Sequence, residues 1–360
     1  MPAVGLEIWT AGVGIPHSTA GQARRAADEG WDGMGVVDSQ NLAADPYIEL
    51  AIAAGVTSTL LLGTAVTNPI TRHPAVAATA AATVHAESSG RMVLGIGRGD
   101  SSLAHLGLAP APVDVFSRYV SRLQAYLRGE DVAFDQTTDG AGQVPPSGSL
   151  GLAGGPDASR VRWISGLPKV PVDVAATGPK VIAAGAALAE RVTFAVGASV
   201  ERVGWAVDLA RAACAAAGRS VDDLGLGIYV PIAVHRDQAT ARALVAGGVA
   251  SYARFSVMHG RVAGPTDEAQ REVLSAVHDA YDMNRHFTHG SPQSSVLTED
   301  VIDTFGIAGP PAYCVERLIE LIDLGLTKVF LLGPGMGADR DDVRASRQLL
   351  VTDVLPAVRR

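Results

Sequence analysis

Short apolar runs bounded by turn residues alternate with longer segments of helical periodicity along most of the chain. The runs are typical of buried strands and lie at residues 4–10, 32–38, 60–66, 91–97, 170–176, 191–196, 224–234 and 327–332. Helices are predicted between them at residues 18–29, 45–55, 74–87, 113–127, 179–189, 200–217, 238 onward, 311–324 and 341 onward. Eight strands with intervening helices predict an α/β fold, a closed parallel (β/α)8 TIM barrel. A doubly wound open sheet is the alternative, but no GxGxxG motif follows the first strand to support it.

Two segments interrupt this alternation. Residues 136–160 hold six glycines and three prolines without periodicity, which is typical of a long loop. Residues 255–306 combine a helical pattern at 268–281 with the polar run MNRHFTHGSPQSS. We therefore expect one domain over residues 1–360, with insertions after strands four and seven at about 131–165 and 255–306. Both are expected on the barrel face where active sites lie.

Composition and charge narrow the class of partner. The 360-residue chain has a net charge of −8 and no basic block, which speaks against nucleic acid. No apolar run approaches the ~20 residues of a membrane span, so we expect no membrane partner and a cytoplasmic protein. Cys214 and Cys314 lie far apart without a ligand spacing, and we expect buried free thiols.

Several predicted strands carry residues suited to chemistry. Glu7 in the first strand either faces the barrel interior, paired or protonated, or points outward to a salt bridge. Asp38 ends the second strand, where a carboxylate can bind a ligand or cap a helix. The fourth strand runs into the glycine-rich turn 97–102, which places Asp100 over the barrel mouth and lets a ligand approach the backbone.

The turn after the fifth strand predicts an anion site. Gly178 as N-cap and Pro179 in the first turn leave the backbone N–H groups of Lys180 and Val181 free, beside a cation. Such a helix start suits a phosphate; an ordinary helix start is the alternative.

Other reactive arrangements find little support. His278, His286 and His289 lie near Asp279 and Asp282, but their order matches no recognised ligand spacing, and we expect no metal. No Ser/His/Asp or Cys/His arrangement favours a covalent nucleophile.

Three stretches carry a resemblance to a known family: GTAVTNPITRHPAV from Gly63, SGRMVLGIGRGDSSLAHLGL from Ser89, and GPPAYCVERLIELIDLG from Gly309. They resemble the bacterial-luciferase-like superfamily, and within it the branch of methylenetetrahydromethanopterin reductase and other enzymes that use the deazaflavin coenzyme F420. The similarity runs from Glu7 to about Leu332 and leaves out residues 136–160.

The resemblance implies a site. It places a non-prolyl cis peptide bond at Ala65–Val66, against the deazaflavin ring. The residues expected to contact the cofactor are Asp38, Thr64, Ala65, Val66, Asn68, Gly97, Arg98, Gly99, Ala176, Thr177, Gly178, Pro179 and Lys180. Glu7 and Asp100 match acidic residues near the reacting centre, where two carboxylates in a water-poor site would raise one pKa and provide a proton donor. Trp9, Tyr229 and His286 are expected to line the substrate side.

The hypothesis is an F420-dependent oxidoreductase that passes a hydride between the deazaflavin carbon C5 and a small organic substrate, most simply a C=N, C=C or C=O group. An FMN-dependent monooxygenase of the same superfamily is one alternative, and a non-catalytic flavin-binding barrel is a second. The resemblance also implies a homodimer, with the alanine-rich helix at 75–86 as its candidate face.

Overall fold

The computed structural model describes residues 5–137, 144–258 and 260–359. Its strands are β1 (Glu7–Gly12), β2 (Gly33–Val36), β3 (Leu61–Thr64), β4 (Met92–Ile96), β5 (Val172–Ala176), β6 (Arg191–Phe194), β7 (Gly225–Val234), β8 (Ile307–Gly309) and β9 (Lys328–Leu332). All pairings between these strands are parallel.

Eight of these strands close into a barrel. The order is β1-β2-β3-β4-β5-β6-β7-β9, and β9 pairs with β1 to complete the ring. The predicted (β/α)8 barrel is confirmed. Seven of its strands lie within a predicted run, and β1 overlaps its run but extends two residues beyond it, to Gly12. Sequence reasoning missed β8, a short strand that pairs with the carboxyl end of β7 outside the ring.

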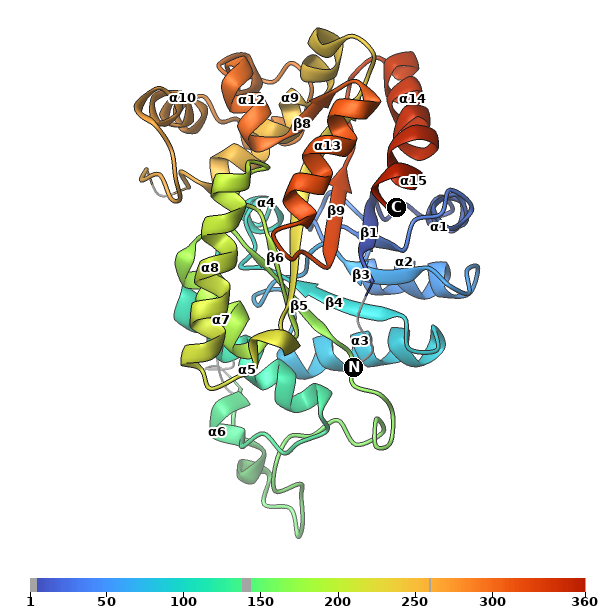
Figure 1. The fold of residues 1–360 in the computed structure, drawn as a ribbon. Coiled ribbons are helices and arrows are strands. Elements are labelled where there is room, and N and C mark those ends of the chain that lie inside the picture. The colour runs from blue at the N-terminus through green and yellow to red at the C-terminus, as the bar shows by residue number, and fades with distance from the viewer. Residues whose placement is uncertain (1–4, 138–143, 259, 360) are drawn as a thin grey trace.

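Helices surround the barrel and extend one end of it (Figure 1). The helices that follow the barrel strands are α1 (Thr19–Asp28), α2 (Pro46–Ala54), α3 (Pro74–Glu87), α4 (Ser101–Ala104), α5 (Val113–Leu127), α7 (Pro179–Leu188), α8 (Val200–Ala216), α13 (Pro311–Ile322), α14 (Arg340–Leu349), η4 (Leu350–Val354) and α15 (Leu355–Val358). The others are α6 (Phe134–Thr137), η1 (Ser147–Leu150), η2 (Val221–Asp223), α9 (Gln238–Phe255), α10 (Glu268–Asp279), η3 (Met283–Arg285), α11 (Pro292–Ser295) and α12 (Glu299–Phe305).

The helix that begins at Gln238 was expected to cover the barrel after the seventh strand, but α13 takes that place against α8 and η4. Helix α9 instead packs on α10, α11, α12 and β8. Together with the end of β7 they form a second apolar core, separate from the one between barrel and helices. The insertion after β7 therefore comprises α9 to α12 and β8.

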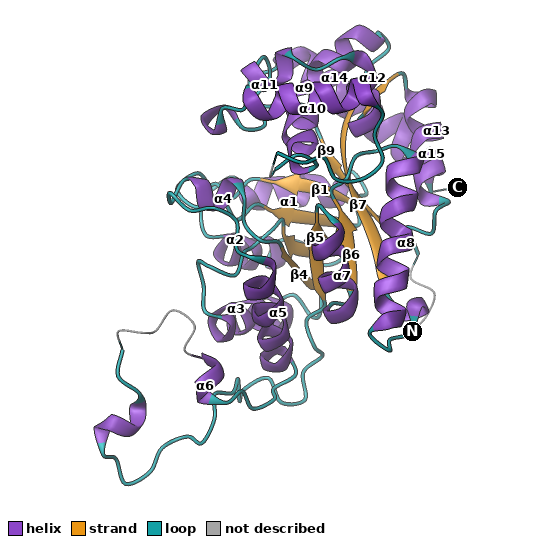
Figure 2. Ribbon diagram, turned by 90° about the vertical axis from the view of Figure 1, so that its left-hand side faces the viewer, coloured by secondary structure: helices purple, strands orange, loops and turns teal. Residues whose placement is uncertain are grey.

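The first insertion lies elsewhere than expected. It leaves the carboxyl end of α5 and enters β5 at the amino end of that strand. Both views place α6 at the opposite end of the molecule from α9–α12 (Figures 1 and 2); residues 138–143 of this insertion lie outside the described part of the chain. The expectation that residues 131–165 lie on the active-site face is wrong, because a segment between a barrel helix and the next strand opens at the amino ends of the strands.

The barrel interior is filled by three aromatic rings opposite glycine. Side chains alternate along each strand, so Ile8 joins the outer core while Trp9 points inward with Phe330 and Tyr229. The ring centroids of Phe330 lie 6.3 Å from Trp9 and 5.0 Å from Tyr229. The rings fit because β2 presents glycines to them: a Cβ on Gly33 would lie 2.4 Å from the Trp9 ring.

Two further predictions from the sequence concern the cysteines and membrane-spanning helices. Cys214 and Cys314 are buried free thiols, as predicted. Among the described residues, no helix has the length and apolar character needed to cross a membrane.

The glycine–aromatic packing predicts a selective loss of stability. Gly33→Ala should lower the free energy of unfolding by about 1–3 kcal/mol, because the buried Trp9 ring has no space into which to move. Urea titration followed by fluorescence measures this. The matched control is Gly21→Ala on the exposed side of α1, where a Cβ meets nothing within 4 Å. Equal stabilities of the two variants would contradict the packing argument.

Candidate active site

A cavity of about 680 Å3 opens at the carboxyl ends of the barrel strands. Residues from the ends of β1 to β7 and β9 line it, together with α9 and the segment around η3. Its surface is mainly apolar, with a small number of polar groups in the strand-end turns. Ligand sites of (β/α)8 barrels lie at this face and have this character.

The end of β3 forms one wall. The peptide bond Ala65–Val66 is cis, as predicted, and both residues line the cavity. Thr64 does not line the cavity and donates a hydrogen bond from its hydroxyl to the Gly95 carbonyl at 2.6 Å; its expected contact with a cofactor stays a prediction. A Cβ on Gly95 would lie 2.1 Å from the Thr64 carbonyl oxygen, so glycine permits this close approach of the strand ends.

The turn after β4 forms the adjacent wall. Gly97, Arg98, Gly99 and Asp100 all line the cavity, as expected. Gly99 has a φ of 77°, a conformation that favours glycine. The Arg98 guanidinium donates from Nε to the Ala111 carbonyl, and burial lowers its pKa. Asp100 forms an ion pair with Arg254 of α9, which joins the turn to the insertion.

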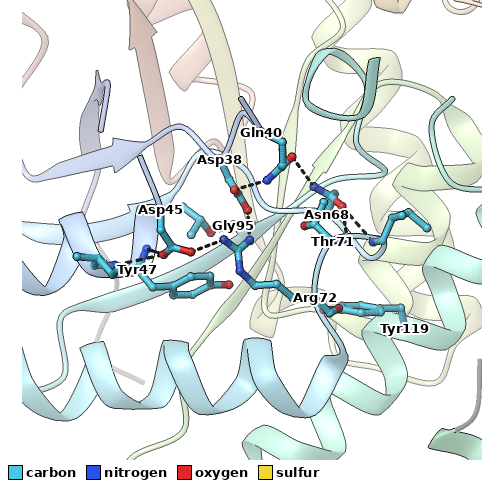
Figure 3. A network of polar contacts seen from close by, with 12 residues as sticks. Asp38, Gln40, Asp45, Tyr47, Asn68, Thr71, Arg72, Gly95 and Tyr119 are labelled. Carbon is cyan, nitrogen blue, oxygen red and sulfur yellow. Dashed lines mark hydrogen bonds and ion pairs between the residues drawn. The ribbon is translucent and has the colours of Figure 1, made fainter. Parts of the chain in front are cut away.

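Asp38 lines the cavity but is already paired (Figure 3). Its carboxylate accepts from Gln40 Nε2 and from Arg72 Nη1, each at 2.6 Å. Arg72 also bridges to Asp45 at 2.7 Å, and despite the opposing effect of burial these carboxylates raise its pKa. The side chain of Asp38 is thus held in one orientation at the end of β2.

Asn68 lies beside this network and does not line the cavity. Its Oδ1 accepts from the backbone N–H groups of Ile70 and Thr71 at 3.0 and 3.1 Å, and its Nδ2 donates to Gln40 (Figure 3). It shapes the turn that leads to α3, and its expected contact with a cofactor stays a prediction.

The turn after β5 meets the cavity at Thr177 and Val181. Ala176 is buried in the outer core, and Gly178, Pro179 and Lys180 do not line the cavity, so the expected site is only partly formed by these residues. Gly178 is the N-cap of α7 and no side chain caps that helix start. The Val181 N–H, which was expected to be free, donates to the Gly178 carbonyl at 3.1 Å, so the predicted anion site loses one of its two N–H groups.

Glu7 lies far from this cavity. It begins β1 and therefore sits at the amino end of the barrel, where Arg191 Nη1 and Nη2 each donate to its carboxylate at 2.9 Å. Trp9 Nε1 donates to the same carboxylate at 2.9 Å. Glu7 does face the interior and is paired, but the predicted carboxylate pair with Asp100 is wrong. The two residues lie at opposite ends of parallel strands, and each is paired with its own arginine.

Trp9 also lies below the cavity. It is fully buried, and its ring packs under the Phe330 ring and against Lys328 Nζ, 4.0 Å from the ring centroid. Its expected contact with substrate is therefore wrong. Tyr229, which was expected beside it, does line the cavity from β7.

A buried ion pair lies between Trp9 and the amino end of the barrel. Lys328 Nζ donates to Asp173 Oδ2 at 2.8 Å, and Thr193 donates to both oxygens of the same carboxylate. Burial acts to raise the pKa of Asp173, but the charges of Lys328 and Arg191 outweigh it and the pKa is lowered. The barrel thus has a charged layer at its amino end, an aromatic layer above it and the cavity above both.

His286 lines the cavity from the insertion after β7, as predicted. Sequence reasoning missed the residues around it. Arg254 and Tyr252 come from α9, and Tyr281 comes from the end of the insertion helix. For Tyr252 and Arg254 the signal in the sequence was the spacing of polar and aromatic residues on α9, which a buried helix of any protein can show.

Comparison with known proteins places this geometry in context. The sequence model of the luciferase-like monooxygenase family matches residues 9–328. A 5,10-methylenetetrahydromethanopterin reductase of Archaeoglobus fulgidus is 29% identical over 343 residues, covering 93% of each chain. An F420-dependent glucose-6-phosphate dehydrogenase of Beutenbergia cavernae is 27% identical and covers 86% of this chain and 82% of its own.

A solved structure has a similar fold. The coenzyme F420 dependent tetrahydromethanopterin reductase of Methanopyrus kandleri superposes with a TM-score of 0.72. The superposition covers 98% of this chain and 99% of that chain, at 22% identity.

The buried ion pair predicts a large and pH-dependent loss of stability. Lys328→Met should lower the free energy of unfolding by about 3–5 kcal/mol at neutral pH, because it leaves the Asp173 carboxylate buried without its partner. In the parent, the pKa of Asp173 is lower in the folded than in the unfolded state, so the ionised carboxylate stabilises the fold at pH values above the unfolded pKa. This stabilisation is lost as the pH falls through the folded pKa. In the variant burial raises that pKa, so the difference between the two proteins should narrow toward and below pH 4.

Denaturant titrations at several pH values measure this difference. Lys169→Met is the matched control, because the Lys169–Glu190 pair is partly exposed and its loss should cost no more than about 1 kcal/mol. The explanation by a buried unpaired charge would be contradicted if the loss of unfolding free energy in Lys328→Met did not depend on pH. It would also be contradicted if that loss were no larger than in Lys169→Met.

Proposed function

The chain belongs to the luciferase-like monooxygenase family, and from that membership we propose that it is an oxidoreductase that uses coenzyme F420. The reaction proposed is hydride transfer between the deazaflavin and a small organic substrate. The observation that carries the proposal is the cavity over Ala65–Val66 and the strand-four turn, in a chain that resembles an F420-dependent dehydrogenase over 86% of its length and shares its fold with a coenzyme F420 dependent reductase.

The residues present fit a flat, largely apolar ring system. Ala65, Val66, Gly97, Ala175 and Ala195 line the cavity with small side chains or none. A Cβ on Gly97 would lie 3.0 Å from Val66, so the glycine keeps open the space beside the cis peptide bond. Such a wall permits close approach of a planar ring to the backbone.

The polar end of the cavity fits a phosphate. Thr177 lines the cavity where α7 begins, and the start of that helix has no side-chain cap. A phosphodiester such as the one that F420 carries would accept hydrogen bonds from the Thr177 hydroxyl and nearby backbone N–H groups. The cofactor, when bound, supplies the hydride; the chain supplies orientation and exclusion of water.

Cofactor binding tests the proposal directly. Titration of the purified protein with F420, followed by fluorescence quenching, should give micromolar affinity, and calorimetry with FMN should give much weaker binding. Gly97→Val should weaken F420 binding roughly tenfold to a hundredfold, because the added side chain fills the space beside Val66.

Gly21→Ala is the control for this series, since Gly21 lies on the outside of α1. Micromolar binding of FMN with none of F420 would instead support an FMN-dependent monooxygenase. Binding of F420 without turnover of any reducible substrate or alcohol would support a non-catalytic binding protein.

We also propose that two copies of the chain associate through α2 and α3. These helices pack against each other and expose three large aliphatic side chains on their outer faces, with Ile48 63% exposed, Ile52 42% and Val76 57%. On α3 the positions between are small, which allows close approach of a second helix. A surface of this kind is typical of an interface between proteins.

Sedimentation analysis checks the association. The parent should sediment as a dimer, and Ile48→Glu combined with Ile52→Glu should yield a folded monomer, because two buried carboxylates on an apolar interface are strongly unfavourable. Ile319→Glu on α13, also an exposed aliphatic position, should leave the dimer intact. A parent that is monomeric, or a double variant that stays dimeric, would contradict this interface.

A further inference from the structure

The cavity continues over the rim of the barrel and beneath α14. Besides the strand ends, its lining includes Val343, Ser346, Arg347 and Leu350, which follow one another along α14 into the start of η4. Their spacing puts them on one face of the helix. Over these two turns a helix rises by ~10 Å, so the cavity runs for about that length along α14. We call this part of the cavity the α14 slot.

The opposite wall of the α14 slot is the outer face of the barrel. Ile232 of β7 and Leu331 of β9 line the cavity, and both belong to the core between the barrel and its helices. Trp31 belongs to the same core and also lines the cavity. Because Trp31 precedes β2, it lies toward the amino ends of the strands, whereas Val343 follows the carboxyl end of β9. The slot therefore descends from the barrel mouth, at Val343, to Trp31 and Leu350.

The polar side chains that α14 brings to the slot already have partners. Ser346 Oγ accepts from the backbone N–H of Val234 at 2.9 Å. Arg347 Nε and Nη2 donate to the Glu29 carboxylate at 2.8 and 2.6 Å. Trp31 Nε1 donates to the same carboxylate at 2.9 Å. Because these groups are satisfied within the protein, this wall offers a ligand apolar contact and gives no reward for a polar group.

The slot is narrow and ends blindly. Ile232 and Leu331 are each 1% exposed, and Trp31 is 5% exposed, so each side chain meets the cavity with only a small part of its surface. Such a space admits one extended chain and excludes a ring system. Beyond Leu350, the next apolar residues of this helical segment, Val354 and Leu355, are buried without lining the cavity.

The helix changes its geometry at the lower end of the slot. Leu350–Val354 form a π-helix, which begins with the residue that lines the cavity. Pro356, in the first turn of α15, has no N–H to donate to the Thr352 carbonyl, so one α-helical hydrogen bond is lost there. Single π-helical turns are rare, and they are frequent at functional sites.

The slot lies across the barrel from the part of the cavity that fits the cofactor. In the ring order β1-β2-β3-β4-β5-β6-β7-β9, β1 is opposite β5 and β9 is opposite β4. Ala65–Val66 and Gly97 follow β3 and β4, and Thr177 follows β5. A cofactor that lies between these residues leaves the slot on the side of β1 and β9 open to a second molecule.

We propose that the α14 slot binds an unbranched apolar chain of the substrate and leaves the reacting group at the barrel mouth beside the deazaflavin. This inference rests on the proposed function and adds a substrate class to it: a molecule with an extended alkyl chain of about 10 Å, the length of an octyl group. Burial of each methylene in the slot strengthens binding. Because the slot ends at Trp31 and Leu350, the length of the chain determines where the reacting carbon lies.

A series of neutral ketones, from methyl ethyl ketone to methyl dodecyl ketone, tests the slot on the full chain without cofactor. Calorimetry should show binding that tightens about fourfold with each added methylene and gains nothing further beyond the octyl chain. An affinity that does not depend on chain length, or one that still rises from the octyl to the dodecyl ketone, would overturn the inference.

A filled slot should shorten this series. Leu350→Trp occupies the lower end, so the gain in affinity should stop at a shorter chain while methyl ethyl ketone binds as it does to the parent. Gln348→Trp is the matched control, because it adds the same side chain at an exposed position of α14 that does not line the cavity. If Leu350→Trp does not fold, Val343→Trp closes the upper end and should remove the dependence on chain length. A series unchanged from the parent in either filled variant would overturn the inference.

Tryptophan fluorescence locates the chain. Methyl octyl ketone with bromine on the terminal carbon of its octyl chain should quench Trp31 by contact, and Trp31→Phe should abolish that quenching. Trp9, Trp163 and Trp205, the other tryptophans of the chain, do not line the cavity. Quenching that persists in Trp31→Phe, or ketones that F420 displaces, would place the chain elsewhere and overturn the inference. Failure of the parent to bind F420 would instead reject the proposed function, while the ketone series would still measure the slot.

Discussion

The packing of three aromatic rings against glycine inside the barrel is the constraint on which the rest of the structure depends. Trp9, Phe330 and Tyr229 fill the centre of the barrel only because Gly33 and its neighbours on β2 and β3 leave room for them. The rings separate a charged layer at the amino end from a cavity at the carboxyl end. A larger side chain in place of these glycines would displace the rings toward the charged layer or into the cavity.

This layering explains why the acidic residues at the two ends of the barrel have different surroundings. Glu7 and Asp173 lie below the rings, where arginine and lysine offset the cost of their burial. Asp38 and Asp100 lie above the rings at the cavity, and each is held by an arginine from a neighbouring element. The carboxylates of the cavity therefore join neighbouring elements of its walls through ion pairs.

The sequence was a good guide wherever local pattern determines structure. Apolar runs predicted the eight barrel strands. The cis bond at Ala65–Val66 was predicted only from the resemblance to a known family. Glu7 was misplaced because a resemblance matches residue types, whereas its position at the start of β1 puts it at the wrong end of the barrel. The contacts of His286 could not be predicted, because Ser251, Arg254 and Tyr281 come together only through the packing of an insertion on α9.

The central proposal is that a planar cofactor lies in the cavity against Ala65–Val66 and the strand-four turn, with the insertion opposite. A crystal structure of the protein with F420 tests that claim most directly. The account predicts electron density for the deazaflavin ring beside Val66 and Gly97, the phosphate end toward Thr177, and His286 across the ring from the wall formed by β3. Density for the ring outside this cavity, or in it with His286 turned away, would contradict the account.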